Sequence, residues 1–281
     1  MPTFLMATDL SARSDRAIER ALILARDREA KLYVVHVVDE ALPEAMALHQ
    51  KAAAEDTIAK HIAGLQPGEE VAVSVESKFG KNGEAILQSA HELKADLVIL
   101  GERDRAYERR FRGTSCERIL RMGDVPVLVV RDRPDRSYRR VAVAVDFSLH
   151  SRRALEVAVR LVPDAEVHLV HAYQVPFSGF MYGSDTRRQV KEQEQNRLEN
   201  MVENEMGALC EALGVDAGKF HRVLRLGDVR QVVRQEVERI KPDLLALGTH
   251  GRTGIANALL GSVAEDVLRD PPCDVLAVKA W

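Results

Sequence analysis

The chain repeats itself, and the length of the repeat limits the folds that it can adopt. Residues 9–14 (DLSARS) match residues 146–151 (DFSLHS) at an offset of 137. The offset falls to 135 at the next apolar run and rises to 147 further on, so the second copy carries about a dozen extra residues after its second strand. A period of roughly 140 residues is too long for a solenoid unit and is typical of duplicated globular domains.

We therefore expect two domains, 1–131 and 140–281, joined by a linker at 132–139 whose charges are solvated. Hydrophobic residues make up 46% of the chain and charged residues 30%, with a net charge of -3, as in ordinary soluble globular proteins. This charge argues against general nucleic-acid binding. No apolar segment approaches the ~20 residues of a membrane span, and the first residues lack the pattern of a signal peptide. We expect a cytoplasmic protein.

The three cysteines, Cys116, Cys210 and Cys273, are scattered along the chain. Three thiols cannot all pair with one another, and their spacing is not that of a zinc site. The sequence therefore predicts neither a disulfide framework nor a metal centre.

Short apolar runs alternate with longer segments of helical period in both halves, as in βα units that build a parallel sheet. The runs 97–100 and 244–247 are apolar at every position, as expected for central strands covered by helices on both faces. The fold class is α/β, and each domain should form an open five-stranded parallel sheet flanked by helices. The expected strands are 3–7, 31–37, 71–75, 96–100 and 127–130 in the first half, and 140–145, 166–172, 221–225, 243–247 and 275–278 in the second.

Serines follow the first strand of each half, where a helix should begin. Ser11 or Ser14 in the first half, and Ser148 or Ser151 in the second, precede apolar residues at helical spacing. Serine is favoured at helix N-caps because its hydroxyl accepts a hydrogen bond from a backbone amide of the first turn.

A glycine pattern follows the fourth strand of the second half. It runs from Gly248 through Gly251 to Gly261 and Ser262, which is G-x2-G-x9-G-S. In an open parallel sheet, ligands bind at the carboxyl ends of the strands, near the point where the strand order reverses. Glycines let the backbone approach a phosphate closely, and the amides at the start of a helix attract an anion. The pattern favours a phosphate site, with a plain turn after the strand as the alternative.

Asp146 ends the first strand of the second half, where its loop faces the same crevice. One interpretation is that its carboxylate caps the following helix. The other is that the carboxylate accepts a hydrogen bond from an adenine amino group or a ribose hydroxyl. The two roles are compatible.

These residues resemble the nucleotide-binding members of the universal stress protein family, which carry G-x2-G-x9-G-[ST] after the fourth strand. The similarity covers both halves and identifies the chain as a tandem member of that family. The resemblance implies ATP as the ligand, with ADP and AMP as alternatives and with or without Mg²⁺. Carried over residue by residue, the site comprises Ala144, Asp146 and Ala172 around the adenine and ribose, and Gly248, Thr249, His250, Gly251, Arg252, Thr253, Gly254, Gly261, Ser262 and Val263 around the ribose and phosphates.

The resemblance also implies how the halves assemble. They should pack together as two subunits do in single-domain relatives, with the last strand of each half contributing. One chain would then be a pseudo-dimer, and association of two chains into a homodimer stays open.

The first half departs from the glycine pattern. Asp104 takes the place of the second glycine, and the loop between Gly101 and Gly113 is one residue shorter. The carboxylates of Glu102 and Asp104 would each repel nearby phosphate oxygens by more than ~1 kcal/mol. We expect weak or absent nucleotide binding in this half. The arginines of the loop form either a site for another anion or a solvated surface; they are Arg103, Arg105, Arg109, Arg110 and Arg112.

The sequence carries no recognisable catalytic signature. A P-loop, a dinucleotide fingerprint at the first βα turn and a nucleophile elbow are all absent, and we name no catalytic residue and no metal ligand. His36 and His171 end second strands and are expected to be core or hydrogen-bonded residues. His250 lies in the phosphate loop, where its protonated imidazole would donate to a phosphate.

Three functions follow. The first is an ATP-binding stress-response module that regulates or signals through nucleotide occupancy. The second is an interaction protein whose pocket is vestigial or takes another ligand, and the third is a slow ATP hydrolase. The extra segment 175–213 either covers the pocket as a lid or packs on its own domain as a longer loop and helix.

Overall fold

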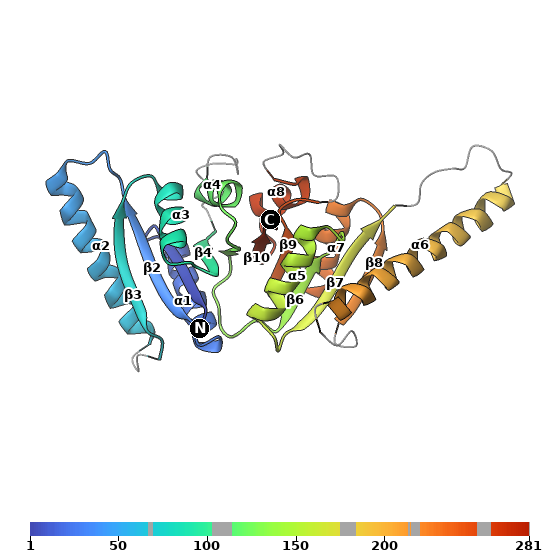
Figure 1. The fold of residues 1–281 in the computed structure, drawn as a ribbon, viewed down its shortest axis with the longest axis horizontal. Helices are drawn as coiled ribbons and strands as arrows, with labels where there is room; N and C mark the ends of the chain where they lie inside the picture. Colours follow the sequence, from blue (N-terminus) through green and yellow to red (C-terminus); the bar gives the residue numbers. More distant parts are fainter. Residues whose placement is uncertain are drawn as a thin grey trace.

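The computed structural model describes residues 1–66, 70–102, 114–174, 184–212, 214, 220–251 and 260–280. The same succession of strands and helices occurs in both halves, which lie side by side (Figure 1). The first half contains β1 (Thr3–Thr8), α1 (Ala12–Asp27), β2 (Lys31–Val38), α2 (Glu44–Leu65), β3 (Val73–Phe79), α3 (Asn82–Glu92), β4 (Leu97–Gly101), α4 (Ser115–Met122) and β5 (Val127–Val130). The second contains β6 (Arg140–Ala144), α5 (Leu149–Leu161), β7 (Glu166–Tyr173), α6 (Ser184–Ala212), β8 (Phe220–Leu226), α7 (Val229–Ile240), β9 (Leu244–Gly248), α8 (Ser262–Arg269) and β10 (Asp274–Val278).

The strands form one continuous ten-stranded sheet in the order β3-β2-β1-β4-β5-β10-β9-β6-β7-β8. Pairs within each half are parallel, whereas β5 and β10 pair antiparallel, with Leu128 opposite Leu276. The expected α/β class and the joining of the halves through their last strands are confirmed. The strand order reverses between β1 and β4 and again between β6 and β9, and each reversal creates a crevice at the carboxyl ends of the strands.

A hydrophobic core lies on each face of the sheet. Ile99 points into the core formed with α1, α2, α5 and α6, while its neighbour Val98 points into the core formed with α3, α4, α7 and α8. Both side chains are fully buried. The uninterrupted apolar run of β4 follows from this arrangement, because successive residues of a strand alternate between faces and both faces are covered.

The two helices that follow the first strands begin as the sequence predicts. Ser11 caps α1 by accepting a hydrogen bond from the amide of Ser14, and Ser148 caps α5 by accepting one from the amide of Ser151. The first serine of each pair is therefore the N-cap, and the second lies inside the helix.

The third strand of the first half was placed too early by the sequence pattern. We expected 71–75, and β3 spans Val73–Phe79. Val71 is buried but lies before the strand, because the side-chain amide of Gln66 donates to its carbonyl oxygen (2.9 Å) and accepts from its amide (3.1 Å). The strand continues through polar residues such as Glu76 because β3 is at the edge of the sheet.

The charged side chains of the segment 132–139 are exposed, as we expected, yet the segment also makes fixed contacts with the first half. It packs on α1, where Arg133 forms an ion pair with Glu19 (3.0 Å) and Ser137 donates a hydrogen bond to the Asp27 carboxylate. Tyr138 is buried, with 5% of its surface exposed. The linker is therefore part of the packed structure between the halves.

Asp274, the first residue of β10, collects the contacts of this segment. Its carboxylate is buried and accepts hydrogen bonds from the hydroxyl of Tyr138 (2.5 Å) and from the amides of Arg131 (2.8 Å) and Asp132 (3.2 Å). The guanidinium of Arg20 lies 3.4 Å from the same carboxylate and stacks on the Tyr138 ring.

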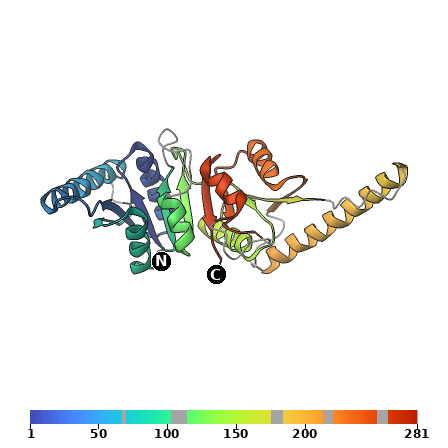
Figure 2. The ribbon, with the colours of Figure 1, turned by 90° about the horizontal axis from the view of Figure 1, so that it is seen from above.

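Helix α6 is anchored at its carboxyl end. Met206 and Leu209 are buried in the core beside β7 and β8. The amino-terminal part of the helix extends well beyond the edge of the sheet (Figures 1 and 2) and leads away from the β6–β9 crevice. The described part of α6 therefore does not form the lid considered above, and 175–183 and 213 lie outside the described residues.

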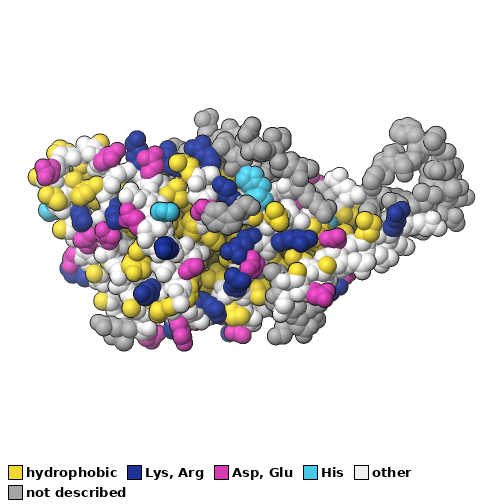
Figure 3. All heavy atoms as spheres, viewed as in Figure 1, with side chains coloured by type: hydrophobic (Ala, Val, Ile, Leu, Met, Phe, Trp, Pro, Cys, Tyr) yellow, Lys and Arg dark blue, Asp and Glu magenta, His cyan; other side chains and the backbone are white. Residues whose placement is uncertain are grey.

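Basic and acidic side chains are interspersed on the face of the molecule shown in Figure 3, in keeping with the net charge of -3. Within the described residues, every helix is either too short or too polar to cross a membrane.

Candidate functional site

The carboxyl ends of β6 and β9 meet at the second crevice. Ala144 and Leu247 are partners in the parallel pairing of these strands. The loop after β6 carries Asp146, and the loop after β9 begins with Thr249, which is fully buried and donates its amide to the carbonyl of Val278 (2.9 Å). The expected site residues Arg252, Thr253 and Gly254 lie outside the described residues.

Asp146 supports the helix cap without being the cap. Its Oδ1 accepts hydrogen bonds from the amide (3.0 Å) and the hydroxyl (2.6 Å) of Ser148, and Ser148 in turn caps α5. The other carboxylate oxygen, Oδ2, faces the loop after β9. The capping interpretation of Asp146 is therefore replaced by an indirect one, and its Oδ2 is directed to the crevice.

Gly251 lies directly against that carboxylate. A Cβ atom at this position would come within 2.7 Å of Asp146 Oδ2. A Cβ at Gly261 would be 3.2 Å from the carbonyl oxygen of Thr249 and 3.5 Å from the Cα of His250. Because neither residue has a side chain, the backbone at Gly251 can lie close to the Asp146 carboxylate, and the backbone at Gly261 can lie close to that of Thr249 and His250. The main-chain groups of these residues are then near enough to hold a ligand.

Gly248 has a different role from these two glycines. A Cβ at Gly248 would be 2.7 Å from the Cβ of His150, and a Cβ at Gly101 would be 2.9 Å from the carbonyl oxygen of Arg13. Each glycine therefore lets the strand end pack on the helix that follows the first strand of its half. Because Gly101 does the same in the half that lacks the full pattern, Gly248 is not by itself a mark of a phosphate site.

The helices that follow the two loops begin differently. In α4 the side chain of Thr114 caps the helix by accepting from the amide of Glu117 (2.9 Å). In α8 the cap residue is Gly261, which has no side chain to offer. The start of a helix carries partial positive charge and outward-directed amides, so α8 is better suited than α4 to receive an anion.

The remaining expected site residues lie at the same end of the sheet. Ala144, Ala172 and Val263 are half-buried, and Ser262 is exposed at the first turn of α8. Every expected site residue that the structure describes thus lies at or just beyond the carboxyl ends of the strands of the second half.

The three histidines that the sequence pointed to occupy two kinds of environment. His36 is buried and its Nδ1 lies 2.9 Å from the carbonyl oxygen of Thr8, and His171 makes the equivalent contact with Val145 (2.6 Å). Both were expected to be core or hydrogen-bonded residues, and this is confirmed. His250 lies in the loop after β9, with its Nδ1 3.1 Å from the hydroxyl of Thr249.

His150 is a functional candidate that the sequence reasoning missed. It lies in the first turn of α5, and its ring centroid is 5.0 Å from that of His250. Burial, followed by the neighbouring His250, lowers the pKa of His150 below its ordinary value. The sequence offered one signal for it: His150 is two residues after Ser148, at the start of the helix that follows the loop of Asp146.

The first half has a related arrangement around Asp9, with the second serine of the pair as the hydroxyl donor instead of the first. Its Oδ1 accepts from the hydroxyl of Ser14 (2.6 Å) and the amide of Ser11 (3.0 Å). Burial acts to raise the pKa of Asp9, but hydrogen bonds from Ser11 and Ser14 outweigh it and hold the pKa below its ordinary value. Asp104, Gly113 and the loop arginines 103–112 lie outside the described residues, so weak binding in this half stays a prediction.

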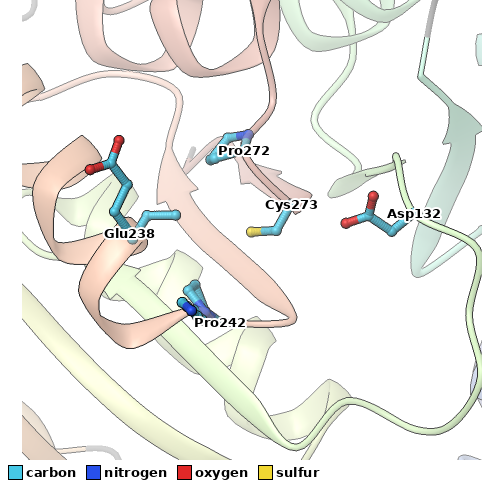
Figure 4. Close-up of a pocket in the computed structure, with 7 residues that line it drawn as sticks. Asp132, Glu238, Pro242, Pro272 and Cys273 are labelled. Atoms are coloured by element: carbon cyan, nitrogen blue, oxygen red, sulfur yellow. The ribbon is translucent and has the colours of Figure 1, made fainter.

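A separate hollow lies at the opposite end of β9 (Figure 4). It has a volume of about 500 Å³ and lies where the first residues of β9 and β10 meet the end of α7; it is lined by Asp132, Val237, Glu238, Lys241, Pro242, Pro272 and Cys273. Since the chemistry of an open parallel sheet is at the carboxyl ends of its strands, this hollow is not the candidate site. Among the described residues, no three His, Cys, Asp or Glu side chains gather in a way that suits a metal ion.

The fold and site define a tandem α/β protein with a glycine-lined crevice at the strand reversal of its second half. The sequence profile of the Universal stress protein family matches residues 1–131 and 137–279. The chain belongs to this family.

Curated relatives carry the same family name. The universal stress protein E homolog of Haemophilus influenzae is 29% identical over 207 residues, which cover 70% of this chain and 66% of the relative. A universal stress protein of Methanocaldococcus jannaschii is 31% identical over 148 residues, which cover 50% of this chain and 82% of the relative. The chain thus spans just under two thirds of the length of the Haemophilus protein.

Solved structures share the whole fold. A universal stress protein from Archaeoglobus fulgidus aligns with a TM-score of 0.70 at 20% identity, covering 99% of this chain and 98% of that one. A functionally unknown protein from Pseudomonas aeruginosa aligns with a TM-score of 0.70 at 16% identity, covering 99% and 92%. A universal stress protein in complex with cAMP aligns with half of this chain at 26% identity and a TM-score of 0.35; the cAMP is a property of that protein.

Proposed function

We propose that the second half binds an adenine nucleotide at the carboxyl ends of β6 and β9, with ATP as the main ligand and ADP or AMP as alternatives. The chain would act as a stress-response regulatory module through this occupancy. The proposal is carried by the close approach of Gly251 to the Asp146 carboxylate: a Cβ atom added at Gly251 would lie 2.7 Å from Asp146 Oδ2. Helix α8 begins nearby, and its cap residue, Gly261, has no side chain.

The chemistry of the crevice fits the two ends of a nucleotide. The Asp146 carboxylate is an acceptor for a ribose hydroxyl or an adenine amino group. The backbone at Ala144 and Ala172 would lie along the base, and the first turn of α8 would face the phosphates. A Mg²⁺ ion, where present, would accompany the phosphates of the nucleotide.

We assign the nucleotide to the second half only. In the first half the hydroxyl of Thr114 already occupies the start of α4, and a nucleotide phosphate would have to displace it. We also propose domain boundaries at 1–131 and 140–281, since β5 ends at Val130 and β6 begins at Arg140.

The test is denaturing extraction of the purified full chain, followed by mass spectrometry for adenine nucleotides and by a titration with added ATP. Two variants form a matched pair. Asp146→Ala and Asp9→Ala each remove one hydrogen bond from a serine amide and one from a serine hydroxyl at the start of the following helix, so their structural losses are comparable. We expect about one nucleotide per chain in the wild type and in Asp9→Ala, and a loss of affinity of tenfold or more in Asp146→Ala, about 1.4 kcal/mol.

A second variant examines the glycine. Gly251→Ala places a methyl group against the end of the Asp146 side chain, which can move aside, so folding should change little while nucleotide affinity falls. Gly207→Ala is its control, since nothing lies within 4 Å of a Cβ at that position. No bound nucleotide and no affinity for added ATP would overturn the proposal.

That negative result would favour the interaction-protein function, to which the projecting helix α6 adds support. An exposed helix that leaves its own domain can offer a surface to a partner. Release of phosphate from ATP that is lost in Asp146→Ala would favour the slow hydrolase.

A further inference from the structure

Two consecutive residues after β10 touch both halves of the chain. The ammonium group of Lys279 donates hydrogen bonds to the carbonyl oxygens of Arg121 (3.1 Å) and Gly123 (3.3 Å), at the end of α4 in the first half. The amide of Ala280 donates to Nδ1 of His150 (2.8 Å), in the first turn of α5. The segment Lys279–Ala280 thus connects the end of α4 with the mouth of the proposed nucleotide site.

The segment has a counterpart on the other side of the interface. The offset of 148 residues that relates β5 to β10 relates Arg131 to Lys279 and Gly123 to Pro271. Arg131 donates to the carbonyl oxygen of Pro271, as Lys279 does to that of Gly123. Each segment therefore holds the end of the last helix of the opposite half.

The two segments differ in what holds their own backbone. The amides of Arg131 and Asp132 donate to the carboxylate of Asp274, which is buried. The amide of Ala280 donates to an imidazole nitrogen. A carboxyl group can accept hydrogen bonds whether it is ionised or protonated. An imidazole nitrogen that gains a proton becomes a donor and can no longer accept a hydrogen bond.

The hydrogen bond with Ala280 fixes the state of His150. Since Nδ1 accepts, the ring is neutral and carries its proton on Nε2. The charged and titratable groups that face it come from every neighbouring segment: His250 from the loop after β9, Asp146 from the loop after β6, and Lys279 from the segment after β10. Burial, His250 and Lys279 lower the pKa of His150, and Asp146 raises it.

A phosphate would change this balance. The backbone at His250 lies 3.5 Å from a Cβ built on Gly261, at the start of α8, so a phosphate at that helix start would lie beside His250, whose ring contacts that of His150. An anion close to the His150 imidazole favours its protonated form. The anion would thus act against burial and against the repulsion from His250, the two largest causes that lower the pKa of His150.

We infer that His150 couples phosphate binding to the contact between the halves. When the phosphates of a nucleotide bind beside His250, Nδ1 of His150 takes up a proton from solvent and loses the hydrogen bond from the Ala280 amide. The segment Lys279–Ala280 is then released from α5, and its hold on the end of α4 weakens. This inference rests on the proposed nucleotide site, and it adds a route by which occupancy of the second half reaches the first.

The first experiment needs no nucleotide. Amide and imidazole NMR signals of the full chain are followed between about pH 5 and 8, the range in which histidines titrate. We expect the Ala280 amide to shift with the same midpoint as the His150 ring, and its hydrogen exchange to accelerate as His150 becomes protonated.

The matched variant is His150→Asn. The Oδ1 atom of asparagine can lie where Nδ1 lies and accept from Ala280, but it takes up no proton. The Ala280 amide of this variant should be independent of pH in the same range. If the chemical shift and the hydrogen exchange of the Ala280 amide stay constant while His150 titrates in the wild type, the inference is overturned, whatever the chain binds.

The second experiment adds ATP to the wild type and to His150→Asn. Calorimetry in two buffers of different ionisation enthalpy counts the protons taken up, and we expect about one proton fewer in the variant. Hydrogen exchange near the end of α4 should rise on ATP binding in the wild type only. ATP binding with equal proton uptake and equal exchange in both proteins would overturn the coupling while leaving the proposed function intact; absence of ATP binding would overturn the proposed function and the phosphate step of the coupling together.

Discussion

At the scale of single residues, identical amino acids in this chain have different roles according to what lies next to them. Gly248 and Gly101 let strands pack on helices, whereas Gly251 lies against a carboxylate that faces the crevice. The spacing in the sequence could find all three, because glycine is required at each. It could not sort them, because the neighbouring atoms belong to segments about 100 residues away.

A Cβ at Gly248 would meet backbone atoms of α5, which cannot move without displacing the helix. We expect Gly248→Ala to lower the free energy of unfolding by about 1–3 kcal/mol, as overpacking does, and Gly101→Ala to do the same in the first half. Urea unfolding of the full chain measures both. Gly64→Ala is the control, because a Cβ there meets nothing within 4 Å and alanine favours the helix by about 0.5–1 kcal/mol. A neutral Gly248→Ala would contradict the packing role.

His150 should make stability depend on pH. Its pKa in the folded chain lies below the ordinary 6.5, so the folded chain binds a proton less readily than the unfolded chain. The stabilising contribution is therefore fully present above about pH 6.5 and is lost as the pH falls through the lower folded pKa. Unfolding free energies measured across this window should fall more steeply in the wild type than in His150→Asn. Equal slopes would contradict the assignment.

At the scale of elements, the starts of the helices distinguish the two halves more clearly than their strands do. Helix α4 has a side-chain cap from Thr114, and helix α8 begins at Gly261 without one. The sequence contains a Gly-Thr pair before α4 and a Gly-Ser pair before α8. Whether the glycine or the hydroxyl residue is the cap depends on the residue at which each helix begins. The same limit explains the misplaced third strand, where the side chain of Gln66 satisfies the backbone of Val71 before the sheet begins.

Loss of the Thr114 cap should weaken α4. We expect Thr114→Ala to lower the free energy of unfolding by about 1 kcal/mol, because the amide of Glu117 loses its acceptor. Chemical denaturation of the full chain measures it. Ser115→Ala is the control, since it changes the next residue of the same helix and leaves the cap in place. A loss as large in the control would show that the cap is not the cause.

At the scale of the whole molecule, the two halves form one sheet whose centre is the antiparallel pair of β5 and β10. The linker fills one side of that junction, where Asp274 accepts from Tyr138 and from two backbone amides. Burial raises the pKa of Asp274, and hydrogen bonds from Tyr138 and the Arg131 amide act to lower it. The residue of the first half that corresponds to Asp274 is Pro126, which has no carboxylate. The junction is therefore asymmetric although the halves are similar.

Removal of the buried carboxylate should destabilise both halves. We expect Asp274→Ala to lower the free energy of unfolding by about 3–5 kcal/mol, because Arg20 would keep a buried charge without its counter-ion and Tyr138 a buried hydroxyl without its acceptor. Thermal and urea unfolding would report the loss. Asp132→Ala, whose side chain is 69% exposed, should change stability by less than about 1 kcal/mol. Similar effects from the two variants would contradict a special role of the buried cluster.

The sequence by itself determined the duplication, the α/β class, the strand content of each half and the crevice where Asp146 and the glycines meet. These follow from local periodicity and from the rule that parallel strands end at a common edge, so short windows of sequence contain them. Only the tertiary structure decided that the linker packs on α1, that Asp274 collects its contacts, and that His150 stands beside His250 and holds Ala280. Those contacts join segments 100 or more residues apart, and no local pattern of residues encodes which distant atoms the folded sheet brings close together.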